Sequence, residues 1–100
     1  FSGSIYIEDY AFTGHNVSFL TGSHDYHLVG KQRMDDIQIS GRDIIVRKGV
    51  WIGSNAIILG PCEIGENSVI AAGSIVTRDV PARVLSGGAP AKVLKEFICD

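Results

Sequence analysis

A repeat of six residues runs through most of this sequence. Each unit usually begins with an apolar residue, and a small or apolar residue follows four places later. The later units begin at Val46, Ile52, Ile58, Ile64, Ile70 and Val76, and the fourth places after them hold Val50, Ala56, Cys62, Ser68, Ser74 and Val80. The same register appears earlier, with unit starts at Phe1, Ile7, Thr13 and Phe19. An internal repeat of fixed period determines the architecture before local propensity does.

A period of six is compatible with β-strands and not with an α-helix. Side chains two residues apart share one face of a strand, whereas a helical face would drift within two units. Each unit therefore consists of a short strand and a turn, and the turn needs a residue that tolerates positive φ at low cost. Suitable residues stand three places after the unit starts, at Asn16, Gly49, Asn55, Asn67, Gly73 and Asp79. We predict an all-β fold, a parallel β-solenoid.

Two places depart from the repeat near its end. Pro61 occupies a turn position although its φ is locked near −65°, so we expect an irregular corner there. After Pro81, a Gly87-Gly88 turn leads to Pro90, and the spacing of apolar residues that follows favours a short helix over residues 90–98. We expect this helix to cap the open end of the solenoid or to contact a neighbouring subunit.

The chain is predicted to form a single domain. Its parts are an N-terminal coil (1–20), an excursion loop (21–38), C-terminal coils (39–81) and the capping helix (90–98). Because the sequence starts at Phe1, already inside the repeat, we expect an N-terminal portion to be missing.

The excursion loop is the main interruption of the repeat, and it contains His24 and His27. Long loops in compact repeats are usually functional or disordered, and histidine is the natural general base near neutral pH. His15 stands at a turn position and is expected to be exposed. A metal site on the three histidines is conceivable, but the coils after the loop contain no histidine, so no metal is expected.

Composition narrows the class of protein. A net charge of −2 without a run of lysine or arginine argues against a nucleic-acid partner. The apolar stretches are too short to span a bilayer, so no membrane insertion is expected. Two cysteines make no disulfide framework; Cys62 and Cys99 are expected to be free thiols in a reducing compartment, which indicates a cytoplasmic location.

Three stretches of this sequence, together with the hexads, resemble those of the hexapeptide-repeat acyltransferases. They are residues 50–53 (VWIG), 71–81 (AAGSIVTRDVP) and 87–93 (GGAPAKV). Within that family the chain is most similar to maltose, galactoside and capsule or O-antigen sugar O-acetyltransferases. The resemblance implies a left-handed parallel β-helix with three hexads per coil, assembled as a homotrimer with its active sites between adjacent subunits.

The resemblance also implies a set of site residues. The catalytic histidine of the family follows a Thr-Gly pair, which corresponds to His24 in Thr21-Gly22-Ser23-His24. It would take a proton from a hydroxyl of a sugar acceptor and return it to the thiolate of coenzyme A, with Asp25 or a backbone carbonyl orienting its imidazole. The cosubstrate would be acetyl-CoA. The positions that correspond to its binding residues are Ser54, Ala72, Thr77, Arg78 and Lys92.

Some features of the sequence leave alternatives open. Position 2 is Ser where the sugar O-acetyltransferases have an acceptor-binding aspartate, so the acceptor pocket differs or lies outside this segment. Trp51 could line the site or contact another subunit in a trimer. The same scaffold could acetylate an amino sugar, or it could be a non-catalytic assembly module. A metal-dependent hydratase of the γ-carbonic-anhydrase type would need a histidine in the later coils.

Overall fold

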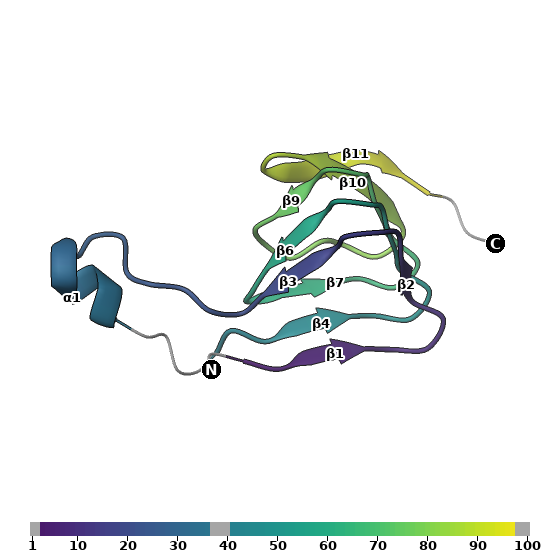
Figure 1. Cartoon of the computed structure of the whole chain (residues 1–100). Helices are drawn as coiled ribbons and strands as arrows, with labels where there is room; N and C mark the ends of the chain where they lie inside the picture. Colours follow the sequence, from purple (N-terminus) through teal and green to yellow (C-terminus); the bar gives the residue numbers. More distant parts are fainter. Residues whose placement is uncertain (1–2, 37–40, 98–100) are drawn as a thin grey trace.

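The computed structural model describes residues 3–36 and 41–97 and shows a three-sided β-helix from which one segment projects (Figure 1). Each full coil contributes one strand to each of three sheets. The strands of the first coil are β1 (Ile5–Ile7), β2 (Phe12–Thr13) and β3 (Ser18–Leu20); those of the second are β4 (Ile44–Val46), β5 (Trp51–Ile52) and β6 (Ile57–Leu59); those of the third are β7 (Cys62–Ile64), β8 (Val69–Ile70) and β9 (Ile75–Val76). This arrangement confirms the predicted all-β solenoid.

Successive coils stack in parallel register. Sheet A has the strand order β1-β4-β7, sheet B contains β2-β5-β8, and sheet C has the order β3-β6-β9. Ile44 pairs with Cys62 and Ile52 with Ile70, so one coil of the β-helix consists of three hexads. The unit starts from Val46 to Val76 are at most 1% exposed, which confirms that they form the core.

Most corners use the turn residues that the repeat predicted. Residues with positive φ occur at Asn16, Gly49, Asn55, Asn67 and Gly73. Asp79 does not adopt positive φ, which contradicts the prediction: its carboxylate instead accepts a hydrogen bond from the Glu63 N–H (2.9 Å), and Arg83 takes the positive φ of 57° further on. The corner at Pro61 is irregular as expected, since the Gly60–Pro61 peptide bond is cis.

The predicted C-terminal helix over residues 90–98 is wrong. The chain forms β10 (Val84–Gly88) and β11 (Ala91–Glu96), an antiparallel hairpin that extends sheet B beside β8. The free edge of β8 offers backbone partners to β10, and β10 offers them in turn to β11; this long-range pairing overrides a weak local helix pattern. The hairpin lies over the end of the β-helix (Figure 1). Residues 98–100, which include Cys99, lie outside the described part of the chain.

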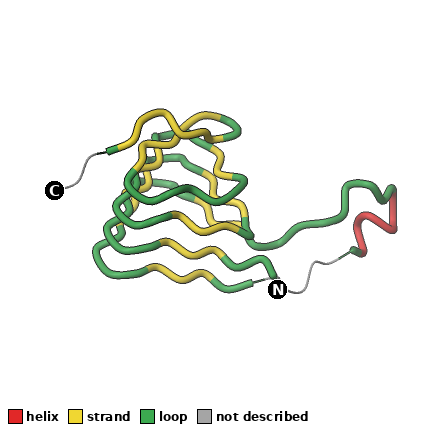
Figure 2. Tube along the Cα trace, turned by 180° about the vertical axis from the view of Figure 1, so that it is seen from behind, coloured by secondary structure: helices red, strands yellow, loops and turns green. Residues whose placement is uncertain are grey.

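The excursion predicted over residues 21–38 projects from the β-helix and is not entirely a loop. We call its described part, residues 21–36, the arm; it contains the six-residue helix α1 (Gly30–Asp35), none of whose residues is buried. Figures 1 and 2 show the arm reaching away from the stacked coils. Residues 37–40 lie outside the described part. Among the described residues, no helix has the length and apolar character needed to cross a membrane.

Candidate active site

Four of the five candidate coenzyme A residues lie on two neighbouring corners of the β-helix, and the fifth, Lys92, lies in strand β11. Ser54 and Ala72 follow β5 and β8, at the corner between sheets B and C. Thr77 and Arg78 follow β9, at the corner between sheets C and A. The outer face of sheet C therefore separates the two pairs, and its outward-facing residues include the half-buried Ile57 and Ile75. The two pairs border one face of the molecule.

The corner between sheets B and C is built from close backbone contacts. The Ser54 hydroxyl oxygen accepts a hydrogen bond from the backbone N–H of His15 at 2.9 Å. A Cβ atom at Gly14 would lie 2.3 Å from that oxygen, and one at Gly53 would lie 2.6 Å from the Ala72 nitrogen, so only glycine fits at either place. Ser54 thus joins two coils, while the small side chain of Ala72 is exposed.

Arg78, at the corner between sheets C and A, and Lys92, in strand β11, line one cavity of about 440 Å³. Both side chains are exposed, and within the described residues neither forms an ion pair. The remaining lining residues are Asp79, Val80, Pro81, Ser86, Pro90, Ala91 and Val93. Two unpaired cations at one cavity suit an anionic group such as a phosphate, where arginine can supply a planar pair of donors. The charged residues of this lining are thus two cations and one carboxylate, Asp79.

A larger groove on sheet A, of about 560 Å³, has the opposite character. Its charged lining residues are Glu8, Arg47, Glu63, Glu66 and Asp79. The Arg47 guanidinium donates to Glu8 at 2.8 Å and to Glu63 at 2.9 Å, and this hydrogen-bonded pairing lowers the pKa of Glu8 below its ordinary value. The single cation is thus already paired, and the remaining carboxylates would repel phosphate. Size alone does not make this groove the coenzyme A site.

His24 lies on the arm, four residues after the last residue of β3. Its side chain is exposed, and within the described residues its imidazole makes no hydrogen bond; its carbonyl accepts from the Ser23 hydroxyl at 3.5 Å. The arm begins at the corner between sheets C and A, the corner that also carries Thr77 and Arg78. Among the described residues of one chain, no hydrogen bond or ion pair joins His24 to the five candidate coenzyme A residues.

Asp25 forms hydrogen bonds with His27 and not with His24, the histidine that it was expected to orient. Its carboxylate accepts the His27 backbone N–H at 2.9 Å and lies 3.0 Å from His27 Nδ1. The bond from the His27 backbone, followed by that from its ring, lowers the pKa of Asp25 below its ordinary value. The His27 ring also stacks on Tyr26 (4.2 Å between centroids). Across the described residues, no three His, Cys, Asp or Glu side chains converge as metal ligands.

Two arginines that the sequence analysis did not single out hold the arm. Arg33 of α1 donates to the carbonyls of Leu28 (2.6 Å) and Tyr26 (2.9 Å), which ties the helix to the preceding loop. Arg42, where the chain returns to the β-helix, donates to the Thr21 carbonyl at 2.6 Å and also to the Gly60 carbonyl. Because their partners are backbone carbonyls, no residue pattern in the sequence could have revealed these contacts.

Residues 43–78 match the family described as bacterial transferase hexapeptide (six repeats). The galactoside O-acetyltransferase of Escherichia coli K12 is 38% identical over 95 residues, which cover 91% of this chain and 47% of that enzyme. A hexapeptide-repeat acetyltransferase from Vibrio cholerae, solved with acetyl-CoA, superposes with a TM-score of 0.85 at 34% identity, over 95% of this chain and 50% of that one. A maltose O-acetyltransferase from Clostridium difficile 630 gives 0.84 at 34% identity, over 94% and 49%.

The repeat, the three parallel sheets and these similarities define a hexapeptide-repeat protein. The chain belongs to the hexapeptide-repeat acetyltransferase family, as the resemblance indicated, and its sheets are consistent with the left-handed β-helix of that family. It spans about half the length of these relatives.

Proposed function

We propose that this protein transfers the acetyl group of acetyl-CoA to a hydroxyl of a sugar or glycan precursor. The observation that carries the proposal is the cavity shared by Lys92 of the hairpin and Arg78, which follows β9 of sheet C just as the His24 arm follows β3 of that sheet. We propose that these two cations bind the phosphates of the cosubstrate and that His24 of the arm supplies the base. The relatives include a galactoside and a maltose O-acetyltransferase and an enzyme solved with acetyl-CoA.

His24 is the proposed general base. Acetyl-CoA supplies the acetyl group as a thioester, whose carbon–sulfur bond breaks as the acceptor oxygen bonds to the carbonyl carbon. The His24 imidazole takes the proton of that acceptor hydroxyl and passes it to the sulfur of the departing coenzyme A. An exposed imidazole without a hydrogen bond in the described residues is available for this role. Ser54, Ala72 and Thr77 are proposed to border the path of the pantetheine chain of acetyl-CoA.

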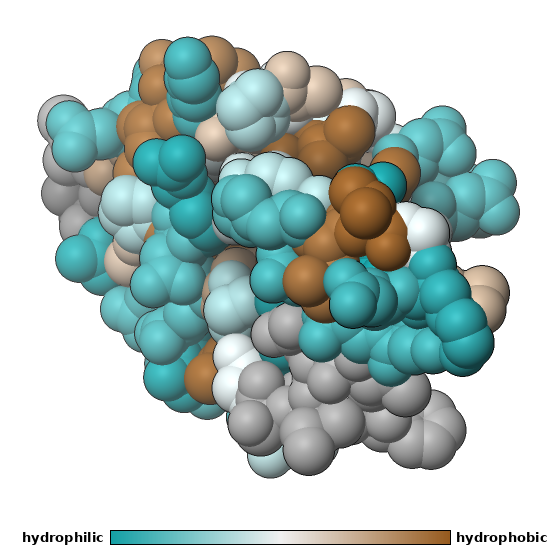
Figure 3. Space-filling view, turned by 90° about the vertical axis from the view of Figure 1, so that its left-hand side faces the viewer, coloured by the Kyte–Doolittle hydropathy of each residue, from teal (hydrophilic) through white to brown (hydrophobic). Residues whose placement is uncertain are grey.

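A homotrimer with sites between subunits is part of the proposal. The arm carries His24 away from the body of its own chain (Figure 1). It also exposes three large apolar side chains, those of Tyr26 (75%), Val29 (68%) and Met34 (67%). Figure 3, which looks onto the side from which the arm projects, shows apolar patches within a mostly polar surface. A neighbouring subunit would cover these residues and bring its own corner residues to His24.

The role of His24 is tested by His24→Gln, with His15→Gln as the matched control. Loss of a general base lowers turnover by about a hundredfold or more. We expect kcat to fall by that factor in His24→Gln while the Kd for acetyl-CoA, measured by calorimetry, stays unchanged. His15→Gln should keep wild-type turnover, because its side chain is exposed at a corner. Wild-type turnover in His24→Gln would disprove the proposed base.

The cosubstrate site is tested by Arg78→Met and Lys92→Met, with Lys95→Met as a control in the same hairpin. A contact between a cation and phosphate contributes about 1.5–3 kcal/mol, so each substitution should weaken acetyl-CoA binding by roughly 10- to 100-fold. Binding of 3′-dephospho-CoA should suffer less in whichever variant removes the partner of that phosphate. Lys95 does not line the cavity, so its substitution should have no effect. Unchanged binding in both cavity variants would contradict the assignment.

A further inference from the structure

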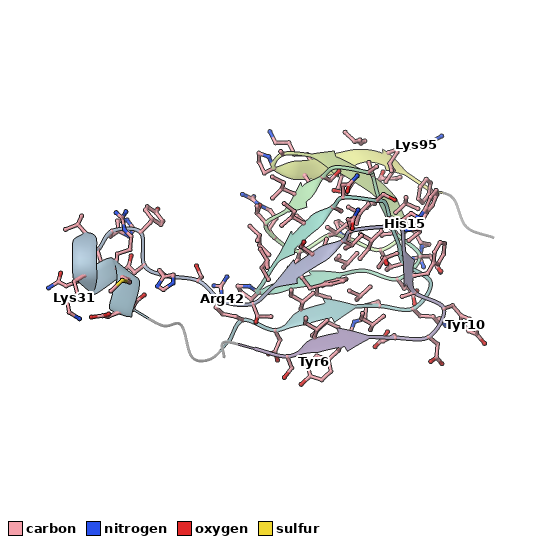
Figure 4. The ribbon with its side chains drawn as sticks, in the orientation of Figure 1. Tyr6, Tyr10, His15, Lys31, Arg42 and Lys95 are labelled. Carbon is pink, nitrogen blue, oxygen red and sulfur yellow. The ribbon has the colours of Figure 1, made fainter. Side chains whose placement is uncertain are left out.

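Arg42 occupies the point where the arm rejoins the β-helix. Its guanidinium donates from Nε to the Thr21 carbonyl at 2.6 Å and from a terminal nitrogen to the Gly60 carbonyl. Thr21 is the first residue of the arm, and Gly60 belongs to the corner after β6 in the next coil. Figure 4 shows Arg42 at the junction of the arm and the coils. One side chain thus ties the departing arm to the body of the molecule.

The backbone around this contact is held closely. A Cβ atom at Gly60 would lie 2.3 Å from the Arg42 carbonyl oxygen, and one at Gly3 would lie 2.5 Å from the Arg42 carbonyl carbon. The Gly60 N–H also donates to the Leu20 carbonyl at 2.9 Å. The main chain of Arg42 is therefore enclosed between Gly3 and Gly60, which fixes the point from which its side chain extends.

His24 lies between two points that arginines hold. On one side, Arg42 binds the carbonyl of Thr21, three residues before His24. On the other, Arg33 binds the carbonyl of Tyr26, two residues after it (2.9 Å). Hydrogen bonds from a charged donor are roughly twice as strong as neutral ones. Of the two arginines, only Arg42 connects the arm to the β-helix, so it sets the direction in which the arm leaves.

We infer that Arg42 is a positioning residue, which acts through the carbonyls of Thr21 and Gly60 to aim the His24 arm at the acetyl-transfer site. The inference rests on the proposed function. A displacement of a catalytic group by 1 Å can cost on the order of a hundredfold in rate, so a small rotation at the root of the arm suffices to impair turnover. Arg42 lines neither the cavity of Arg78 and Lys92 nor the groove on sheet A, so acetyl-CoA binding does not depend on it.

The test compares Arg42→Gln and Arg42→Lys with the control Arg47→Gln. Arg47 also joins three coils, through Glu8 and Glu63, but lies on sheet A away from the arm. In Arg42→Gln we expect kcat to fall by roughly 10- to 100-fold, with the Kd for acetyl-CoA unchanged. Arg42→Lys keeps the charge but not the planar pair of donors, and should lose less. Arg47→Gln should retain wild-type kcat.

Hydrogen exchange provides a readout that is independent of catalysis. In Arg42→Gln, exchange in peptides covering residues 20–26 and at the Gly60 amide should accelerate by about tenfold or more, the equivalent of one lost hydrogen bond to a charged donor. Arg47→Gln should leave these amides at the wild-type rate. If Arg42→Gln does not fold, Arg42→Lys decides, since it preserves the charge and most of the side-chain stem.

The possible failures are distinguishable. Wild-type kcat in the folded Arg42 variants, or the same loss of kcat in Arg47→Gln, would overturn the inference while leaving the proposed function intact. A wild-type protein that neither binds acetyl-CoA nor transfers acetyl would overturn the proposed function and, with it, the catalytic part of the inference. Exchange at residues 20–26 would still decide whether Arg42 holds the arm.

Discussion

Removal of one buried hydroxyl should weaken the attachment of the C-terminal hairpin. Ser68 is fully buried, and its Oγ donates to the Pro81 carbonyl at 2.6 Å and accepts from the Val84 N–H at 3.1 Å. Ser68→Ala therefore leaves a backbone N–H of the 3%-exposed Val84 without its partner. An unsatisfied buried donor costs about 1–3 kcal/mol, and the lost bond to the solvent-accessible Pro81 adds about 1 kcal/mol.

The expected destabilisation is thus about 2–4 kcal/mol. For a domain of this size, 1 kcal/mol corresponds to a shift in Tm of about 4–8 °C, so Ser68→Ala should melt at least about 8 °C below wild type. Unfolding in urea, followed by circular dichroism at one protein concentration, measures the same quantity as a change in midpoint. Pro81 also lines the cavity of Arg78 and Lys92, so the proposed function predicts that acetyl-CoA binding weakens too.

Ser74→Ala is the matched control. Ser74 is also buried, at 1%, but within the described residues its Oγ accepts only from the N–H of Gly88, which is an exposed residue. Its loss should cost about 0.5–1.5 kcal/mol, the net value of one ordinary hydrogen bond. Equal destabilisation by the two substitutions, or a change below about 1 kcal/mol in Ser68→Ala, would refute the argument that the unsatisfied N–H of Val84 dominates.

Two further results are expected. Gly53→Ala should destabilise the fold by about 1–3 kcal/mol in the same urea assay, because its Cβ would lie 2.6 Å from the backbone nitrogen of Ala72; wild-type stability would show that the corner can relax. Burial raises the pKa of the Cys62 thiol from 9.0 to about 11. The thiol of the unfolded chain therefore ionises at lower pH than that of the folded chain, and the free energy of unfolding should fall as pH rises from 9.0 towards 11. In Cys62→Ala this fall should be smaller, and an identical pH profile would exclude Cys62 as its source.

The part of the fold predicted correctly depends on local rules. Alternation of side chains along a strand, with a turn residue in each hexad, was enough to place Ile52, Ile58 and Ile70 in the core and positive φ at Asn55 and Asn67. These features repeat in every coil. A wrong prediction at one turn position, such as Asp79, therefore does not change the predicted fold, because the other coils repeat the same pattern.

The errors lie where the repeat stops. The apolar residues Val93 and Leu94 are spaced as on a helix, yet they belong to a strand and are 48% and 62% exposed. A pattern of that length cannot distinguish a helix from a strand. The segment forms a strand because β10 pairs with the open edge of β8 and β11 pairs with β10. Helix α1 was missed for a related reason, since six residues without a side-chain cap carry little sequence signal.

The sequence by itself determined the period and the inward-facing residues, because these follow from short-range geometry. Its resemblance to a family supplied the candidate site residues, because that resemblance rests on motifs contiguous along the chain. Only the tertiary structure decided that Arg78 and Lys92 share a cavity, that Asp25 pairs with His27, and that Arg42 holds the root of the arm. Those contacts depend on which coil lies against which. Backbone carbonyls, the partners of Arg42, are present at every residue, so the sequence carries no mark of the ones that stacking brings within reach.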